Sequence, residues 1–225
     1  MAMMKRTYTA IFAILALALA LPAVAPATLA EVGVIPPTTS PETVPSCPAS
    51  PCLAVSRTTG FQLKVAKNTT LMTVPRSGSV VAWTIMLGKP NATQIKFFNA
   101  NEGGAAEAGI AILRAQKKPN LTWKLIASSP TVKLQPYFGK TAQFPLERTI
   151  AVKKGDVVAM TVPTWAPALA LGFGKDTSWR ASRARSQCAS TSAQSTHTSI
   201  GSSVQYFCLY QTARLTYSAT LVSTP

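Results

Sequence analysis

The chain has 225 residues, with 22 Lys and Arg against 7 Asp and Glu, and a formal net charge of +15 at pH 7. A charge this large favours anionic partners, and so few carboxylates weaken the case for an acid-pair hydrolase. The sequence contains no phosphate-binding loop, dinucleotide fingerprint, metal triad or calcium loop, which argues against the enzyme classes that depend on them.

Residues 1–30 have the features of a secretion signal. Lys5 and Arg6 precede an apolar run at 11–21, which is shorter than the about 20 residues of a membrane-spanning helix. Thr28-Leu29-Ala30 is a small-x-small cleavage motif. We therefore expect a mature chain that begins at Glu31 and is secreted or associated with the cell envelope. The alternative is an uncleaved N-terminal anchor. No later segment is long and apolar enough to cross a membrane.

Residues 31–51 read as a Pro-rich linker. Such composition favours extended polyproline II structure and does not bury a core. The segment would hold the domain away from a surface or form a disordered tail, and residues 52–225 would form one β-sandwich domain. The prolines are Pro36, Pro37, Pro41, Pro45, Pro48 and Pro51.

Period-two alternation of apolar residues predicts most of the strands. The clearest alternation covers 213–221, which we expect to be one continuous strand. Denser apolar runs at 80–87, 108–113 and 204–210 are typical of strands covered on both faces. The other alternating sets are Phe61, Leu63 and Val65; Leu121, Trp123 and Leu125; and Val132 and Leu134.

Residues 149–165 read as two strands joined by a tight turn at 153–156. Gly155 tolerates positive φ, and Asp156 can bond its own backbone. No stretch shows an apolar stripe with helical spacing. About nine or ten strands with regular turns predict an all-β fold: an antiparallel two-sheet sandwich of jelly-roll type, stabilised by disulfides.

Three motifs in residues 70–165 resemble a pattern in uncharacterised exported β-sandwich proteins of soil actinobacteria. They are Val-Pro-Arg-Ser-Gly-Ser-Val-Val-Ala-Trp at 74–83, Ala-Ile-Leu-Arg at 111–114, and Phe-Pro-Leu followed by Lys-Gly-Asp within 144–156. These are turn and core residues and cover about half of the chain. The resemblance implies export and a β-sandwich, and it carries over no functional residue.

The four cysteines suit an exported protein. Cys47 and Cys52 are near neighbours, whereas Cys188 and Cys208 bracket a Ser/Thr-rich segment. We favour the pairs 47–52 and 188–208 among the three possible pairings. Zinc binding by Cys47-x4-Cys52 is the alternative, but thiolate zinc sites use closer pairs, so we expect no metal and no cofactor.

Catalytic candidates are sparse. His197, the one histidine, occurs in the polar sequence Ser-Thr-His-Thr-Ser and reads as an exposed loop residue without a nearby acid. Asp156 reads as a turn residue, and Glu102 and Glu107 occur in a Gly/Ala-rich loop. The protein is therefore expected not to be an enzyme, although distant carboxylates can converge in a fold.

The segment 179–185 is the strongest binding candidate. Trp179, Arg180, Arg183 and Arg185 place three guanidiniums beside an indole, which suits an anionic group next to a sugar ring. A solvated loop is the competing interpretation. Trp165 is a second candidate, as an exposed platform for a sugar or as a cap on the core. Lys117-Lys118 and Lys153-Lys154 read as solvated turns.

The leading hypothesis is an exported, non-catalytic binding module for an anionic or carbohydrate polymer of the cell envelope or its surroundings. A mature charge of +13, after loss of Lys5 and Arg6 from the +15 chain, supports it. The second hypothesis is a structural or adhesive envelope protein that acts by protein contact. The third is a hydrolase on a β-sandwich scaffold. Export disfavours nucleic acid, so we expect no specific nucleic-acid partner.

Overall fold

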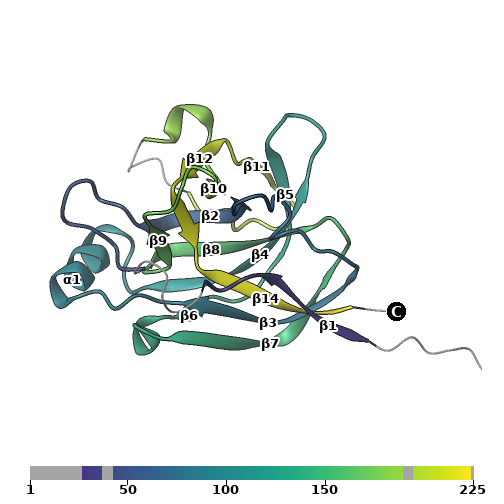
Figure 1. Ribbon diagram of the computed structural model, residues 1–225, viewed down its shortest axis with the longest axis horizontal. Helices are drawn as coiled ribbons and strands as arrows, with labels where there is room; N and C mark the ends of the chain where they lie inside the picture. Colours follow the sequence, from purple (N-terminus) through teal and green to yellow (C-terminus); the bar gives the residue numbers. More distant parts are fainter. Residues whose placement is uncertain (1–26, 37–42, 190–194, 224–225) are drawn as a thin grey trace, which may run out of the picture.

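Antiparallel β-sheets packed against each other make up most of the protein (Figure 1). The computed structural model describes residues 27–36, 43–189 and 195–223. The first sheet has the order β1-β14-β3-β7 and the larger sheet the order β11-β5-β4-β8-β2-β10-β12, with β6 beside β4 and a small β13-β9 pair. The elements are β1 (Thr28–Gly33), β2 (Val55–Lys64), β3 (Gly78–Met86), α1 (Ala92–Asn101), β4 (Glu107–Ala115), β5 (Thr122–Ser128), β6 (Val132–Lys133), η1 (Gln135–Tyr137), β7 (Thr141–Val152), β8 (Val157–Ala166), β9 (Leu169–Leu171), β10 (Ser178–Ala181), η2 (Arg185–Gln187), β11 (Ser203–Gln205), β12 (Cys208–Gln211), β13 (Ala213–Leu215) and β14 (Tyr217–Ser223).

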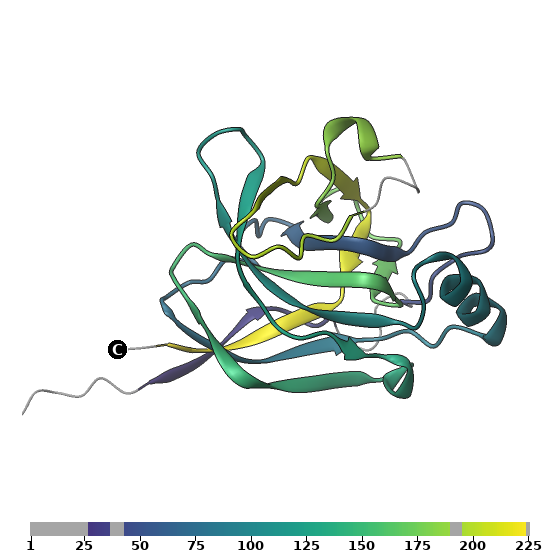
Figure 2. The ribbon, with the colours of Figure 1, turned by 180° about the vertical axis from the view of Figure 1, so that it is seen from behind.

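The core lies between the two main sheets, as the two opposite views show (Figures 1 and 2). Trp83 and Tyr217 enter it from the first sheet, and Ile110 and Met160 from the larger one. Tyr217 also joins the sheets, because its hydroxyl donates to the carbonyl oxygen of Val158 at 2.9 Å. The predicted all-β, antiparallel, disulfide-stabilised fold is confirmed and is consistent with a sandwich. The strand order does not establish jelly-roll connectivity, which stays a prediction.

Both predicted disulfides are present. Cys47 bonds to Cys52, and Cys188 bonds to Cys208. The described residues contain no free cysteine, and zinc binding at Cys47-x4-Cys52 is therefore wrong. Within the described ranges no helix has the length and apolar character needed to cross a membrane.

The expected strand at 213–221 is instead two strands in different sheets. β13 pairs with β9, whereas β14 pairs with β1 and β3. Thr216 separates them, and its hydroxyl donates to the carbonyl oxygen of Met86 at 2.7 Å. The odd-numbered apolar residues from 213 to 221 are buried in both strands, so the alternation continues across Thr216. Periodicity alone therefore could not show where the chain passes from one sheet to the other.

The described parts of the linker expected at 31–51, residues 31–36 and 43–51, lie against the domain, and residues 37–42 are outside the described ranges. Glu31 lies in β1 and accepts hydrogen bonds from the hydroxyls of Ser218 and Thr220 on β14. Thr43 and Cys47 are buried. The β1–β14 ladder holds the first described part in place, and the first disulfide closes a small loop in the second. The expected cleavage point after Ala30 falls inside β1.

Helix α1 was not expected from the sequence. Asn91 and Gln94 form a capping box: each side-chain oxygen accepts from the other's backbone N–H at 2.9 Å. Only Phe98 of the helix is buried. The helix therefore has no apolar stripe to detect, and the capping box was its available sequence signal.

Candidate binding groove

A groove with a volume of about 410 Å³ opens beside the second disulfide. Its walls come from residues 52–54 and the start of β2, from β9, β10 and β12, from residues 212–213, and from the segment that follows β10. It combines leucine side chains with an indole, a phenol, hydroxyls and one guanidinium. The lining residues are Cys52, Leu53, Ala54, Ser56, Thr58, Leu169, Leu171, Trp179, Arg183, Cys188, Ala189, Leu209, Tyr210, Gln211, Thr212 and Ala213.

Strand pairing places the two aromatic rings of the groove together. Trp179 on β10 is directly opposite Tyr210 on β12 in the antiparallel register. Paired residues project to the same face of a sheet, and the ring centroids are 4.7 Å apart with an interplanar angle of 33°. Trp179 is 4% exposed, and its Nε1–H is buried without a hydrogen-bond partner among the described residues.

Arg183 is held against Tyr210. Its Nη1 donates to the Tyr210 hydroxyl at 3.0 Å, and its guanidinium carbon lies 5.9 Å from the ring centroid. The same hydroxyl donates to the carbonyl oxygen of Cys188 at 2.9 Å. Burial raises the pKa of Tyr210, and the nearby charge of Arg183 opposes that rise. The phenol therefore stays neutral and fixes the guanidinium at the groove wall.

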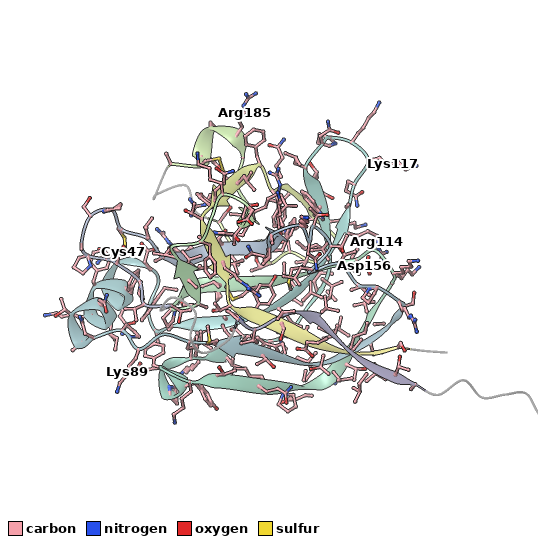
Figure 3. The ribbon with its side chains drawn as sticks, in the orientation of Figure 1. Cys47, Lys89, Arg114, Lys117, Asp156 and Arg185 are labelled. Atoms are coloured by element: carbon pink, nitrogen blue, oxygen red, sulfur yellow. A yellow bond between two sulfur atoms is a disulfide. The ribbon has the colours of Figure 1, made fainter. Side chains whose placement is uncertain are left out.

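The other two predicted arginines lie away from the groove. Arg180 alternates with Trp179 on β10, and its Nη1 donates to the carbonyl oxygens of Tyr206 and Phe207 at 3.1 and 2.9 Å. Burial lowers the pKa of Arg180. Arg185 is exposed at the edge of the molecule, over the Phe207 ring (Figure 3). The expectation that three guanidiniums converge is therefore wrong: the period of a strand separates the first, and η2 carries the third outward.

Trp165 is not an exposed platform. It is 1% exposed and stacks on Phe98 of α1, with ring centroids 4.7 Å apart. Its Nε1–H donates to Asn99 Oδ1 and to the carbonyl oxygen of Gly104, each at 3.0 Å. The helix that the sequence did not reveal covers this indole, so Trp165 caps the core.

His197 is buried, contrary to the expectation of an exposed loop residue. It is 3% exposed, and its ring nitrogens lie 3.1 Å from the Tyr206 hydroxyl and 2.9 Å from Ser202 Oγ. Because Ser202 Oγ donates its hydrogen to the carbonyl oxygen of Ser199, His197 Nε2–H donates to Ser202 and Nδ1 accepts from Tyr206. Burial lowers the pKa of His197. The ring is therefore a neutral structural link.

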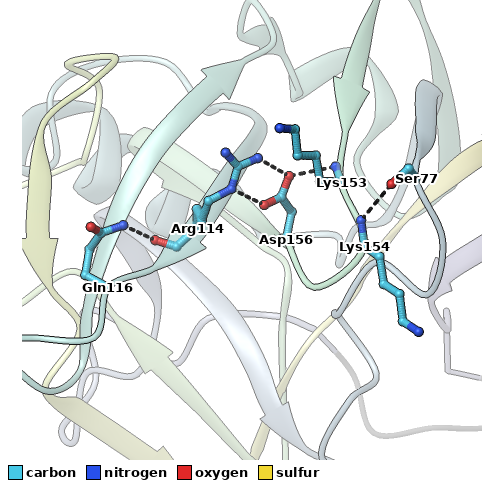
Figure 4. A network of polar contacts seen from close by, with 6 residues as sticks. All are labelled: Ser77, Arg114, Gln116, Lys153, Lys154 and Asp156. Carbon is cyan, nitrogen blue, oxygen red and sulfur yellow. Dashed lines mark hydrogen bonds and ion pairs between the residues drawn. The ribbon is translucent and has the colours of Figure 1, made fainter.

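Two carboxylates considered for catalysis are held in ion pairs. Glu102 Oε2 lies 2.9 Å from Arg57 Nε. Asp156 accepts two bonds from Arg114, at 2.7 and 2.8 Å, and one from the backbone N–H of Lys153 (Figure 4). Within the described residues no group of three or more His, Cys, Asp and Glu side chains could hold a metal ion.

Sequence reasoning found Trp179 and Arg183 but missed Tyr210, Leu209 and Leu53. The available signal for Tyr210 was the second disulfide, since pairing Cys188 with Cys208 brings the residues after Cys208 next to the 179–185 segment. Leu209 and Leu53 are each 42% exposed at the groove. Comparisons with protein-family models, curated proteins and solved structures find no match for this chain.

Proposed function

We propose that the protein is an exported, non-catalytic binding module whose groove takes an acidic segment of a carbohydrate polymer of the cell envelope or its surroundings. The observation that carries the proposal is the arrangement of Trp179, Arg183 and Tyr210 at the groove, with Arg183 fixed by the Tyr210 hydroxyl. Two disulfides are typical of proteins that work in an oxidising compartment, which supports export.

The groove suits a ligand that has both an apolar face and a negative charge. Its volume of about 410 Å³ falls within the range of about 300–1,000 Å³ that is usual for ligand sites. Leu171 and Leu209 offer surface to the C–H face of a sugar ring. A guanidinium forms paired hydrogen bonds with carboxylate, sulfate or phosphate oxygens, so Arg183 would select an acidic sugar over a neutral one.

The second disulfide supports the proposal through the entropy of binding. It joins the segment that carries Arg183 to β12, which carries Tyr210. A wall that is already ordered loses less conformational freedom when a ligand binds, and affinity increases accordingly. Arg183 therefore needs little rearrangement to meet a ligand.

Affinity electrophoresis through gels that contain acidic or neutral polysaccharides tests the proposal. The wild type should be retarded by at least one acidic polysaccharide. Arg183→Gln should raise the Kd by about tenfold or more, because hydrogen bonds to charged groups contribute about 1.5–3 kcal/mol. Arg185→Gln is the matched control: it removes the same charge outside the groove and should change binding little.

Retardation that both variants lose equally would contradict the groove proposal, because net charge alone would then explain binding. Leu209→Ala provides a second variant that leaves every charge in place, and it should weaken retardation by about threefold through lost apolar contact. Melting temperatures of all three variants show whether a loss of binding is a loss of folding.

A second candidate is an adhesive envelope protein that acts by protein contact. The exposed Leu53 and Leu209 at the groove favour it, because exposed apolar residues at a concave site also suit protein partners. Sedimentation velocity over a concentration series separates the two. Self-association that Leu209→Ala abolishes, without retardation by any polysaccharide, would favour adhesion.

A further inference from the structure

Three connections lie side by side at one end of the sheets: β2–β3 (65–77), β4–β5 (116–121) and β7–β8 (153–156), at the right of Figure 1 and the left of Figure 2. The backbone holds the first and third together, since Val74 N–H donates to the carbonyl oxygen of Asp156 at 2.8 Å and Gly155 N–H to that of Val74 at 2.9 Å. Leu113, near the end of β4, pairs with Val157 at the start of β8. We call these three connections the basic end.

The basic end carries six exposed cationic side chains. They are spread over all three connections, and no exposed carboxylate lies among them. Lys117 extends from the β4–β5 connection (Figure 3). None of the six takes part in an ion pair within the described residues. The six are Lys67, Arg76, Lys117, Lys118, Lys153 and Lys154.

Asp156 is the one acidic residue of the basic end, and it is 1% exposed. Arg114 on β4 neutralises its carboxylate through two hydrogen bonds, at 2.7 and 2.8 Å. The turn is also fixed to the β2–β3 connection, since Lys154 N–H donates to Ser77 Oγ at 3.2 Å (Figure 4). The Arg114 side chain is 39% exposed, and its pair with Asp156 is neutral overall, so the charge of the six exposed cations stays uncompensated.

The N-terminal part of the chain joins the domain at this same end. Thr28 at the start of β1 is opposite Ser223, and Ser223 is opposite Gly78, which follows the β2–β3 connection. Thr28 also lines a shallow pocket together with Arg76. The residues before β1 include the apolar run 11–21. β1 therefore brings the chain that follows the expected secretion signal into the domain beside the basic end.

We propose that the basic end docks on an anionic lipid bilayer surface. Five of its six cations are lysines, which are compact point charges without the fork that recognises single anions. They stand on three separate connections, and the groove shares no residue with them. Such an array fits the spread-out phosphates of a lipid surface, to which each nearby Lys or Arg adds attraction. This inference rests on the proposed export and is independent of the groove.

Co-sedimentation with vesicles tests it, using protein purified after export by its host cell. The wild type should bind vesicles of phosphatidylcholine with phosphatidylglycerol, and not vesicles of phosphatidylcholine alone. Binding should weaken as salt increases, because salt screens exposed charges. A basic-end variant with all six cations changed to Gln should lose about tenfold or more of its partitioning.

The matched control changes the same number and kinds of residue elsewhere. Its six sites are also exposed, again five lysines and one arginine, and they lie on α1, β6, β7 and other connections. This variant has the same net charge as the basic-end variant and should keep most of its vesicle binding. Its sites are Lys89, Lys96, Lys133, Lys140, Arg148 and Lys175.

Three results would overturn the proposal. The first is no binding to anionic vesicles, and the second is an equal loss in both six-site variants, which would reduce the effect to net charge. The third is release of wild-type protein from vesicles by soluble polyphosphate at equal phosphate concentration, which would make a polymer the ligand. Arg183→Gln should bind vesicles like the wild type, so failure of the groove proposal leaves this test intact.

Discussion

Trp165 and Trp179 are buried to nearly the same extent, 1% and 4% exposed, yet they belong to regions with different properties. Trp165 lies under α1, stacked on Phe98, and its N–H donates to two acceptors. Trp179 lines a groove, and its N–H has no partner among the described residues. The two residues show that the extent of burial does not distinguish an indole in the core from one that lines a groove. The two indoles differ in whether the ring N–H has an acceptor and in whether a groove lies beside the ring.

Truncation of the two indoles should produce the largest difference in stability between the two regions. Trp165→Ala should lower the free energy of unfolding by about 4 kcal/mol, because it opens a cavity under α1 and leaves the acceptors of Asn99 and Gly104 unpaired. Trp179→Ala should cost at least about 1 kcal/mol less, since the groove already leaves one side of that ring with fewer contacts. Urea denaturation measures both, and equal losses would contradict the distinction.

Removal of each disulfide should lower the free energy of unfolding by a smaller amount. Cys188→Ser with Cys208→Ser opens a separation of 20 residues and should cost about 3 kcal/mol by the chain-entropy estimate. Cys47→Ser with Cys52→Ser opens a separation of 5 and should cost about 2 kcal/mol. Thermal unfolding measures the stabilities, and gel retardation measures the groove. Loss of the Cys188–Cys208 bond should weaken retardation more, because that bond joins the segment of Arg183 to β12, whereas the other bond has only Cys52 at the groove. An equal loss of retardation from both double variants would contradict the role given to the second disulfide.

Protonation of His197, which lies outside both tryptophan regions, should make the smallest contribution: a pH dependence of the free energy of unfolding. Its pKa is lowered in the folded state because burial disfavours the charged ring. Its stabilising contribution is therefore complete above the unfolded pKa of about 6.5 and is lost as the pH falls through the lower folded pKa, with a slope of at most about 1.4 kcal/mol per pH unit. Urea denaturation over this interval should show the slope in the wild type. His197→Gln should show less of it, and an unchanged slope would assign it to other groups.

Much of the fold was predictable because strands carry their own signal. The turn at 153–156 appears where the sequence predicted it, with Gly155 at φ +90°. Helix α1 escaped because a single buried residue, Phe98, leaves no apolar stripe. The division of 213–221 between two sheets escaped for a related reason: alternation reports which side chains are buried, and it does not report which neighbouring strand each backbone segment pairs with.

The site was less predictable, because it depends on contacts between distant segments. Trp179 and Arg183 were selected because three arginines lie near a tryptophan within 179–185, and the structure places both residues at the groove. The directions of Arg180 and Arg185 could not be predicted without knowing that β10 ends at Ala181 and that η2 follows it. The partners of Arg180 are two backbone carbonyls, and composition does not reveal acceptors of that kind.

The most direct test of the groove as the binding site uses the indole N–H signals of the protein's four tryptophans. Each Trp contributes one such signal to a ¹⁵N–¹H NMR spectrum, and Trp→Phe variants assign them. An oligosaccharide prepared from the acidic polysaccharide that retards the protein should change the chemical shift of the Trp179 signal on titration. The chemical shift of the Trp165 signal should stay the same. Movement of the Trp165 signal alone, or changes confined to the backbone amides of the basic end, would contradict the account.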